Sequence, residues 1–257
     1  MKKIYTFPFG EKVEKLTQKD QSPKKVFVLG VYASAVHARW VDANGKQIVA
    51  ALAVASEPEI FWKGEDAEAI IKNIHVPERA GKLMPANSNL NGPSGNSLDD
   101  LFLSPLKITR KDAWLCDLLP ESRVNVNQRK VIDEFYRPIA EKLNLPKATI
   151  PDFDKEELKS TQRRLEILEE LKKSKANTIV LLGDLPIQYF ISHFDNRYKK
   201  LSDFGDAIGE YGRVHEITID GQKYNVIPLC HPRQASRLGA SSAKWFELHK
   251  AWITKKM

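Results

Sequence analysis

The sequence predicts an α/β protein: a three-layer α/β/α sandwich around a mainly parallel central sheet. Continuous apolar runs at 26–29, 113–119 and 178–183 lack the polar alternation of half-exposed strands and are typical of strands buried on both faces. Helical patterns separate these runs, and strands that alternate with helices favour a parallel sheet with helices on both sides. A chain of 257 residues with 42% hydrophobic content can bury one sizeable core, so we expect a single domain over 1–257.

The chain begins with a Lys-rich N-terminal arm, residues 1–25, in which a short apolar motif, Phe7-Pro8-Phe9-Gly10, is expected to dock on the folded body. The first buried strand follows and ends at Gly30. A hairpin insertion over 35–62 comes next, because Asn44-Gly45 supplies the positive φ of a tight turn between two strand-like stretches.

The second half of the chain is also predicted to contain buried strands, helices and a hairpin. The strand at 113–119 precedes a helix at 155–173, whose apolar stripe consists of Leu158, Leu165, Leu168 and Leu171. Asp220-Gly221 predicts a second hairpin that feeds the sheet. Ser241 or Ser242 can cap a last helix with Trp245, Leu248 and Trp252 on one face.

Composition limits the classes of function. The excess of 40 Lys+Arg over 33 Asp+Glu gives a formal charge of +7, which favours a polyanionic partner. No window reaches the roughly 20 apolar residues of a membrane span and no secretion signal is evident, so we expect a soluble, cytoplasmic, monomeric protein. Cys116 and Cys230 cannot build a disulfide framework, a four-thiolate zinc site or an iron–sulfur cluster from this chain alone. No His has metal-ligand spacing, so we expect neither metal nor cofactor.

The ligand crevice of an open α/β sheet lies beyond the carboxyl ends of its strands. This rule selects Gly30, Asp117, Gly183 and His231, each of which lies at or just before the end of a predicted strand or directly after it. A polar loop at 85–97 can add backbone and amide contacts to a ligand.

These segments, in this order, resemble the motifs of the uracil-DNA glycosylase superfamily. The first motif corresponds to 26–34, the Gly-Pro-Ser-Gly segment to 92–99, the base-reading strand to 112–120 and the late strand with its His-Pro to 227–233. The likeness spans about residues 26 to 252. It implies the fold of that superfamily and a DNA glycosylase that flips a base out of DNA, in repair or in defence against modified DNA.

The resemblance also implies positions for base binding. Gly30, Tyr32 and Ser34 lie in the first motif, Leu90 falls near the position of the stacking aromatic residue, and Asp117 replaces the base-reading Asn. Tyr32 is the better candidate for a stacking ring. The first motif contains no carboxylate, so water activation departs from the usual pattern, and Arg233 stands where the family has Ser.

Cleavage of an N-glycosidic bond leaves negative charge on the base and positive charge on the sugar, so the site needs a donor aimed at the base. His231 is the best candidate donor, and a capped surface histidine is the alternative. Asp117 can accept a hydrogen bond from the amino group of cytosine, and burial would raise its pKa; alternatively it caps a turn, pairs with Arg123 or holds the water. Other candidates for holding the water are Asp42, Glu57 and Glu59.

DNA contacts are expected directly after His231 and at Ser94 and Gly95, which precede a helix. Phosphate contacts are assigned to Arg233, Arg237 and Lys244, intercalation to Leu238, and amide contacts to Ser94 and Gly95. We expect a monofunctional glycosylase acting on a uracil-like, cytosine-like or modified pyrimidine base, because no Lys is evidently placed to form a Schiff base. The alternatives are a non-catalytic nucleic-acid-binding protein of the same fold and a hydrolase of free nucleosides or nucleotides.

Overall fold

The computed structural model describes residues 4–237 and 242–256 and divides the chain into two compact units. Unit 1 comprises residues 1–16, 32–93 and 120–154, and unit 2 comprises 17–31, 94–119 and 155–257. The hairpin expected as an insertion into a single domain is therefore part of a unit with its own sheet and core. Within the described ranges no helix is both long enough and apolar enough to cross a lipid bilayer.

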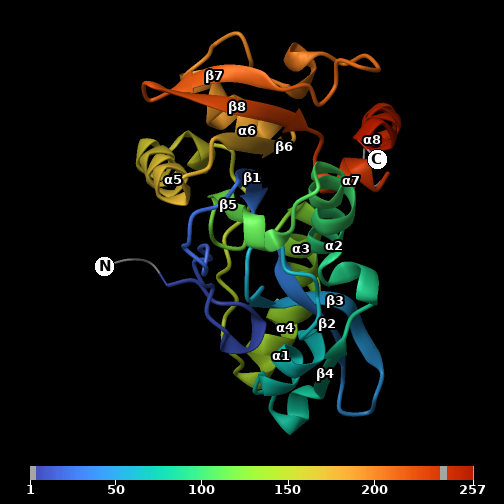
Figure 1. Cartoon of the computed structure of the whole chain (residues 1–257). Helices are drawn as coiled ribbons and strands as arrows, with labels where there is room; N and C mark the ends of the chain where they lie inside the picture. Colours follow the sequence, from blue (N-terminus) through green and yellow to red (C-terminus); the bar gives the residue numbers. More distant parts are fainter. Residues whose placement is uncertain (1–3, 238–241, 257) are drawn as a thin grey trace. The chain divides into compact units, whose positions relative to one another are not determined.

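The sheet of unit 2 has five strands: β1 (Val26–Tyr32), β5 (Ala113–Leu119), β6 (Thr178–Leu182), β7 (His215–Ile219) and β8 (Gln222–Leu229), in the order β5-β1-β6-β8-β7 (Figure 1). β6 pairs in parallel with both β1 and β8, whereas β7 runs antiparallel to β8. The amide of Lys25 donates to the carbonyl of Asp112 at 2.8 Å, so β1 and β5 start side by side and run in the same direction. The sheet is thus mainly parallel, as predicted.

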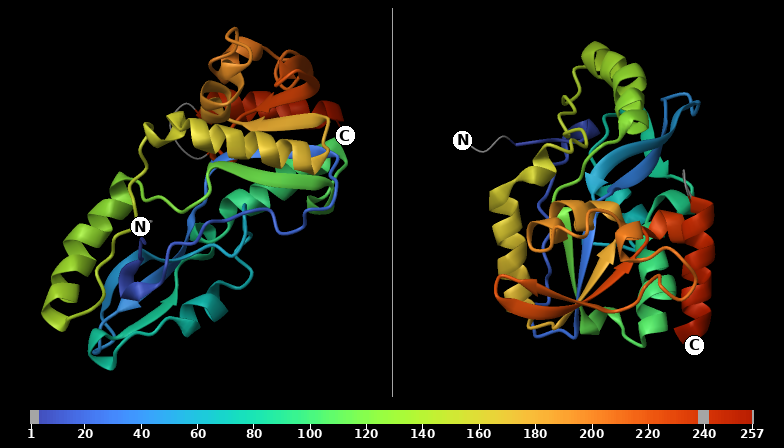
Figure 2. Two further views of the ribbon diagram at one scale, coloured as in Figure 1. Left: turned by 90° about the vertical axis from the view of Figure 1, so that its left-hand side faces the viewer. Right: turned by 90° about the horizontal axis from the view of Figure 1, so that it is seen from above.

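Helices flank both faces of this sheet. They are α5 (Thr161–Ser174), α6 (Asp184–Tyr189), α7 (Pro232–Ala235), α8 (Ser242–Lys256) and a continuous helical stretch formed by α2 (Pro93–Ser97), a π-helix (Leu98–Leu103) and a 3₁₀ turn (Ser104–Leu106). Figure 2 shows α5, in yellow, on one side of the strands and α8, in red, on the other. The three-layer α/β/α arrangement is confirmed.

The helix predicted at 155–173 begins at Thr161, where the Ser160 side chain accepts a hydrogen bond from the backbone amide of Arg163 at 3.2 Å. Its buried face carries Ile167, Leu168, Leu171 and Ser174. Leu165 is 49% exposed, so its place in the predicted stripe was wrong. The reason is periodicity: 167, 171 and 174 lie three or four residues apart on one side of the helix, and 165 points away from them.

Unit 1 contains a three-stranded sheet, β2 (Ala35–Val41), β3 (Gln47–Ser56) and β4 (Lys82–Pro85), in the order β3-β2-β4 with antiparallel pairing throughout. Its α-helices are α1 (Ala67–Asn73), α3 (Val126–Val131) and α4 (Arg137–Leu143), with a π-helical stretch, Ile132–Tyr136, joining the last two.

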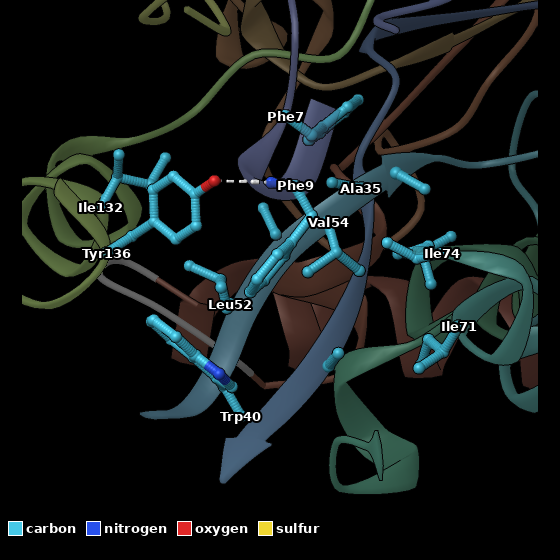
Figure 3. Close-up of a cluster of buried hydrophobic side chains, with 14 of the residues drawn as sticks. Phe7, Phe9, Ala35, Trp40, Leu52, Val54, Ile71, Ile74, Ile132 and Tyr136 are labelled. Atoms are coloured by element: carbon cyan, nitrogen blue, oxygen red, sulfur yellow. Dashed lines mark hydrogen bonds between the residues drawn. The ribbon is translucent and has the colours of Figure 1, made fainter. Parts of the chain in front are cut away.

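The apolar motif of the N-terminal arm enters the core of unit 1. The ring of Phe9 packs on Trp40 and Tyr136, Phe7 is buried in the same cluster, and the backbone amide of Phe9 donates to the Tyr136 hydroxyl at 2.7 Å (Figure 3). That hydroxyl in turn donates to the carbonyl of Pro146, also at 2.7 Å. The docking of residues 7–9 predicted from the sequence is confirmed.

Both predicted hairpins form. Gly45 has a φ of 82° in the turn between β2 and β3, and Asp220 and Gly221 have φ of 48° and 80° between β7 and β8. These left-handed conformations explain the glycine at 45 and the Asp-Gly pair at 220–221.

Candidate functional site

Two of the predicted strand ends in unit 2 touch each other. The amide of Gly183, directly after β6, donates to the carbonyl of Leu229 at the end of β8, at 2.8 Å. Gly183 has a φ of +93°, and a Cβ atom added there would lie 3.2 Å from the Cβ of His231. A glycine at 183 therefore provides both the backbone conformation and the space that bring β6 against His231.

The imidazole of His231 is held in one tautomer. His231 is the N-cap of α7, and its Nδ1 accepts a hydrogen bond from the backbone amide of Arg233 at 3.2 Å. The side chain of Gln234 accepts from the backbone amide of His231 at 3.1 Å. Because Nδ1 is an acceptor, the single proton of the neutral ring is on Nε2. Burial and the charge of Arg233 lower the pKa of His231 to about 4, so the ring is neutral at pH 7 and Nε2 is a donor.

Asp117 is buried in β5, with 3% of its surface exposed. Its neighbour Cys116 and the nearby Trp114 face α5, since Arg163 donates to the Cys116 sulfur at 3.3 Å and Trp114 Nε1 donates to Glu170 at 3.1 Å. Side chains alternate along a strand, so Asp117 points to the opposite face of the sheet.

Burial raises the pKa of the Asp117 carboxyl to about 7, an effect that the charge of Arg163 opposes and the charge of Glu170 reinforces. The sequence predicted a rise for this reason. Arg123, the alternative partner of Asp117 proposed from the sequence, forms an ion pair with Glu121 at 3.5 Å.

Sequence reasoning missed the side chains that hold the backbone around Asp117. β5 is an edge strand, so one side of its backbone has no neighbouring strand. Arg163 donates to the carbonyls of Asp117, at 2.6 Å, and Leu118, at 3.2 Å, and Gln18 accepts from the amide of Leu115 at 3.0 Å. Two side chains from distant parts of the sequence thus make hydrogen bonds to the backbone of this edge strand.

A second group missed from the sequence lies behind His231. The Tyr211 hydroxyl accepts a hydrogen bond from the backbone amide of Cys230 at 2.8 Å and contacts His249 Nδ1 at 2.7 Å. The sequence contained no signal for Tyr211, and His249 was assigned no function.

The structure brings together the two segments predicted to contact phosphate. Ser97, at the end of α2, and Ser236, just after α7, share a hydrogen bond of 2.8 Å although 139 residues separate them. The helical segment with Ser94 and Gly95 is therefore tied to the segment with Arg233 and Arg237. Both arginines are exposed, and Arg237 has a φ of 59° and lies 5.7 Å from the ring of Phe246.

Of the other residues predicted to contact DNA, two have partners within the protein and one lies outside the described residues. The carbonyl of Gly95, which is buried, accepts from Arg110 at 3.1 Å. Lys244 pairs with Asp206, and its Nζ lies 5.4 Å from the ring of Trp245, so its charge is partly compensated. Leu238, the predicted wedge, lies outside the described residues.

Three predicted base-binding residues belong to unit 1. Tyr32 is half-buried, with its ring 5.0 Å from that of Phe153. Ser34 is exposed, and its carbonyl accepts from the Ser122 hydroxyl at 2.6 Å. Leu90 is 40% exposed at the end of a 3₁₀ turn, Ser88–Leu90.

The loop that carries Leu90 is anchored inside unit 1. The Asn91 side chain accepts from the backbone amide of His37 at 2.8 Å and donates to its carbonyl at 3.0 Å. Gly92 follows with a φ of +79°, at a position where a Cβ would lie 2.0 Å from the backbone of Lys63. This packing fixes the exposed Leu90 on a rigid backbone.

The carboxylates considered as holders of the attacking water differ in their surroundings. Asp42 accepts from the amides of Asn44 and Lys46, at 2.9 and 2.8 Å, and so stabilises the first hairpin. Glu57 is buried in unit 1, where it lines a cavity of about 510 Å³, whereas Glu59 is exposed. In unit 2, Asp184 follows Gly183 and accepts from the amide of Leu201 at 2.7 Å; no pattern in the sequence pointed to this carboxylate.

Among the residues described, no three His, Cys, Asp or Glu side chains gather in a way that would hold a metal ion, and both cysteines are buried and free. The predicted site of unit 2 therefore consists of His231 and Asp117, with the exposed Arg233 in α7 and the exposed Arg237 just after it. No known protein-family model matches the chain, and no curated protein is significantly similar to it.

Proposed function

We propose that this protein is a monofunctional DNA glycosylase that hydrolyses the N-glycosidic bond of a flipped pyrimidine-type base. The observation that carries the proposal is the neutral imidazole of His231, whose Nδ1 is engaged by the amide of Arg233. Its Nε2–H is then a fixed donor at a strand end. As the bond breaks, negative charge grows on the base oxygen, and a preorganised donor stabilises that charge more in the transition state than in the bound substrate.

Asp117 is proposed to bind the opposite edge of the base. β5 and β8 are three strand positions apart in the sheet, roughly 14 Å at a spacing of about 4.8 Å per strand. A six-membered ring with a hydrogen bond of about 3 Å at each side is narrower than this strand spacing, so both side chains have to lean over β1 and β6 to reach one base. We propose that they do so and contact opposite edges of the base.

The protonation state of Asp117 determines which base edges it matches. A neutral carboxyl donates from its hydroxyl and accepts at its carbonyl, which matches N3 and the amino group of cytosine. It also matches N3–H and O4 of uracil with the roles of its two oxygens exchanged. The ionised carboxylate only accepts, so it faces the cytosine N3 or the uracil O4 with like charge. The raised pKa of Asp117 therefore supports binding of cytosine-like, modified or uracil-like bases in the neutral form.

DNA is proposed as the partner because the segment after His231 is basic and exposed. Arg233 and Arg237 are both available to phosphates, and the hydrogen bond between Ser97 and Ser236 ties this segment to α2. Phosphate contacts and the net charge of +7 both favour a polyanion and predict binding that weakens as salt rises.

A non-catalytic binder of modified or damaged nucleic acid is the second candidate. One observation favours it: the first motif, residues 30–34, contains no carboxylate, and a neutral Asp117 would be a poor base for water. The same Asp117 and His231 would then recognise the base without cutting it.

The experiment compares labelled oligonucleotides that contain uracil, cytosine, 5-substituted cytosines or hypoxanthine. After incubation with the protein, alkali cleaves any abasic site. We expect strand cleavage with at least one pyrimidine substrate and its loss in His231→Ala, with His193→Ala as a matched control because His193 is an exposed histidine of the same unit. If no substrate is cut although salt-sensitive binding persists, the protein is the binder.

A further inference from the structure

The backbone amide of Cys230 lies beyond the part of β8 that pairs with β7, so β7 offers it no hydrogen-bond acceptor. β7 pairs with β8 only along Gln222 to Val226, so the strand edge beyond Val226 has no neighbour from β7. The Tyr211 hydroxyl takes over at Cys230 and accepts from its amide at 2.8 Å. Both residues are buried, and an amide without an acceptor there would cost about 1–3 kcal/mol.

The direction of the hydrogen bonds that continue from Tyr211 is set at the carbonyl of Leu101. This carbonyl can only accept, so His249 Nε2, 2.9 Å away, carries the single proton of the neutral ring. Nδ1 is then an acceptor, and the Tyr211 hydroxyl, which itself accepts from the amide of Cys230, donates to it at 2.7 Å. Burial lowers the pKa of His249 to about 4, in agreement with a neutral ring. A backbone group at each end thus fixes both side chains.

The protein packs tightly around these two side chains. The ring of His249 lies 4.4 Å from that of Phe102 and 5.2 Å from that of Trp252. Trp252 Nε1 donates to the carbonyl of Gly212 at 3.3 Å, next to Tyr211. A Cβ at Gly212 would lie 2.5 Å from Trp252, so the loop with Tyr211 sits directly on α8. Tyr211 and His249 therefore have little freedom to move.

We propose that Tyr211 and His249 are positioning residues that hold the backbone of Cys230 and thereby aim the Nε2–H of His231 at the base. The inference rests on the proposed function, since it concerns the same imidazole. His231 is fixed from its other sides by Gly183 and by the amide of Arg233. The Tyr211 hydroxyl supplies the remaining restraint, on the residue that precedes His231.

The first experiment replaces one oxygen atom. Tyr211→Phe keeps the ring and removes the hydroxyl, and Tyr224→Phe, at a buried tyrosine within β8, is the matched control. We expect the single-turnover cleavage rate of Tyr211→Phe to fall about 10- to 100-fold, the effect of misplacing a catalytic donor by up to 1 Å, with DNA affinity unchanged within about twofold. Tyr224→Phe should retain the rate.

A second measurement does not depend on cleavage. The ¹⁵N NMR spectrum of His231 should show a single Nε2–H tautomer in the wild type and a mixture of tautomers in Tyr211→Phe, because a displaced ring loses the amide of Arg233. An unchanged His231 spectrum in this variant would overturn the proposal whether or not the rate falls. If the wild type cleaves no substrate, the proposed function fails, and the spectrum alone still decides whether Tyr211 positions His231.

Variants of His249 separate positioning from general packing. The amide of His249→Gln can accept from Tyr211 and donate to Leu101, whereas His249→Leu can do neither. We expect Gln to restore the wild-type tautomer of His231 and most of the rate, and Leu to reproduce Tyr211→Phe. Equal behaviour of the Gln and Leu variants, or an equal loss in Tyr224→Phe, would show that only packing matters and would refute the inference.

Discussion

Replacement of Asp117 by Asn tests the central electrostatic claim about the site. Asn has nearly the shape of a neutral carboxyl but cannot ionise. The folded protein raises the pKa of Asp117 from 3.8 to about 7, chiefly through burial. Between about pH 4 and pH 7 the native state therefore binds more protons than the unfolded chain, and wild-type stability falls as the pH rises through this window.

The size of the effect follows from the two pKa values. At about 1.4 kcal/mol for each pH unit between them, ionising Asp117 in the folded protein costs about 4 kcal/mol above pH 7. Asp117→Asn does not carry this cost. Its free energy of unfolding should equal that of the wild type near pH 4 and exceed it by up to about 4 kcal/mol at pH 8.

Urea unfolding of both proteins at pH 4, 6 and 8 measures this difference, and Asp100→Asn, at an exposed carboxylate of the same unit, reports any general effect of exchanging Asp for Asn. In the cleavage assay, the variant should keep at pH 8 the rate that it has at pH 6, whereas the wild type should lose rate as Asp117 ionises, because an amide, like a neutral carboxyl, both donates and accepts. A stability difference that does not change with pH would refute the buried-carboxyl argument, and the same loss of rate between pH 6 and pH 8 in both proteins would remove Asp117 from base recognition.

Four further predictions concern single contacts. His231→Ala should lower the cleavage rate about 100-fold or more while DNA binding persists; a rate within tenfold of wild type in single-turnover assays would contradict its role. Gly183→Ala should lower stability by about 1–3 kcal/mol and slow cleavage, because φ is +93° and the new methyl group would press on His231; thermal unfolding that matches wild type would contradict this. Arg233→Gln and Arg237→Gln should each reduce the slope of log affinity against log salt by about 1, whereas unaltered slopes would exclude phosphate contacts. Phe9→Ala should destabilise the protein by about 3–5 kcal/mol, because Phe9 packs on two other rings; calorimetry showing less than about 1 kcal/mol would contradict its place in the core.

Much of the fold could be predicted because the relevant signals are local. An unbroken apolar run such as 178–182 has no exposed face to accommodate polar side chains, so it indicates a strand covered on both sides. Asp220-Gly221 has the φ preferences of a tight turn whatever surrounds it. The positions of Asp117 and His231 near the ends of strands follow from the same patterns.

The division into two units could not be predicted from such local patterns. Residues 1–16, 32–93 and 120–154 are separated in the sequence, and their common core forms only when the arm with Phe7 and Phe9 meets Trp40 and Tyr136. Leu165 shows the same limit on a smaller scale, since an apolar residue in a helix is buried only if that side of the helix finds a neighbour.

The sequence by itself determined the three buried strands of the central sheet, the two hairpin turns and the residues with useful chemistry near the strand ends, because propensity and periodicity act over a few neighbouring residues. Only the tertiary structure decided the state of those residues. Arg163 reaches Asp117 across 46 positions, and Tyr211 reaches Cys230 across 19. Protonation and aim depend on such contacts, which exist only after distant segments have packed and excluded water, whereas the tautomer of His231 is set by the amide of Arg233, two residues away.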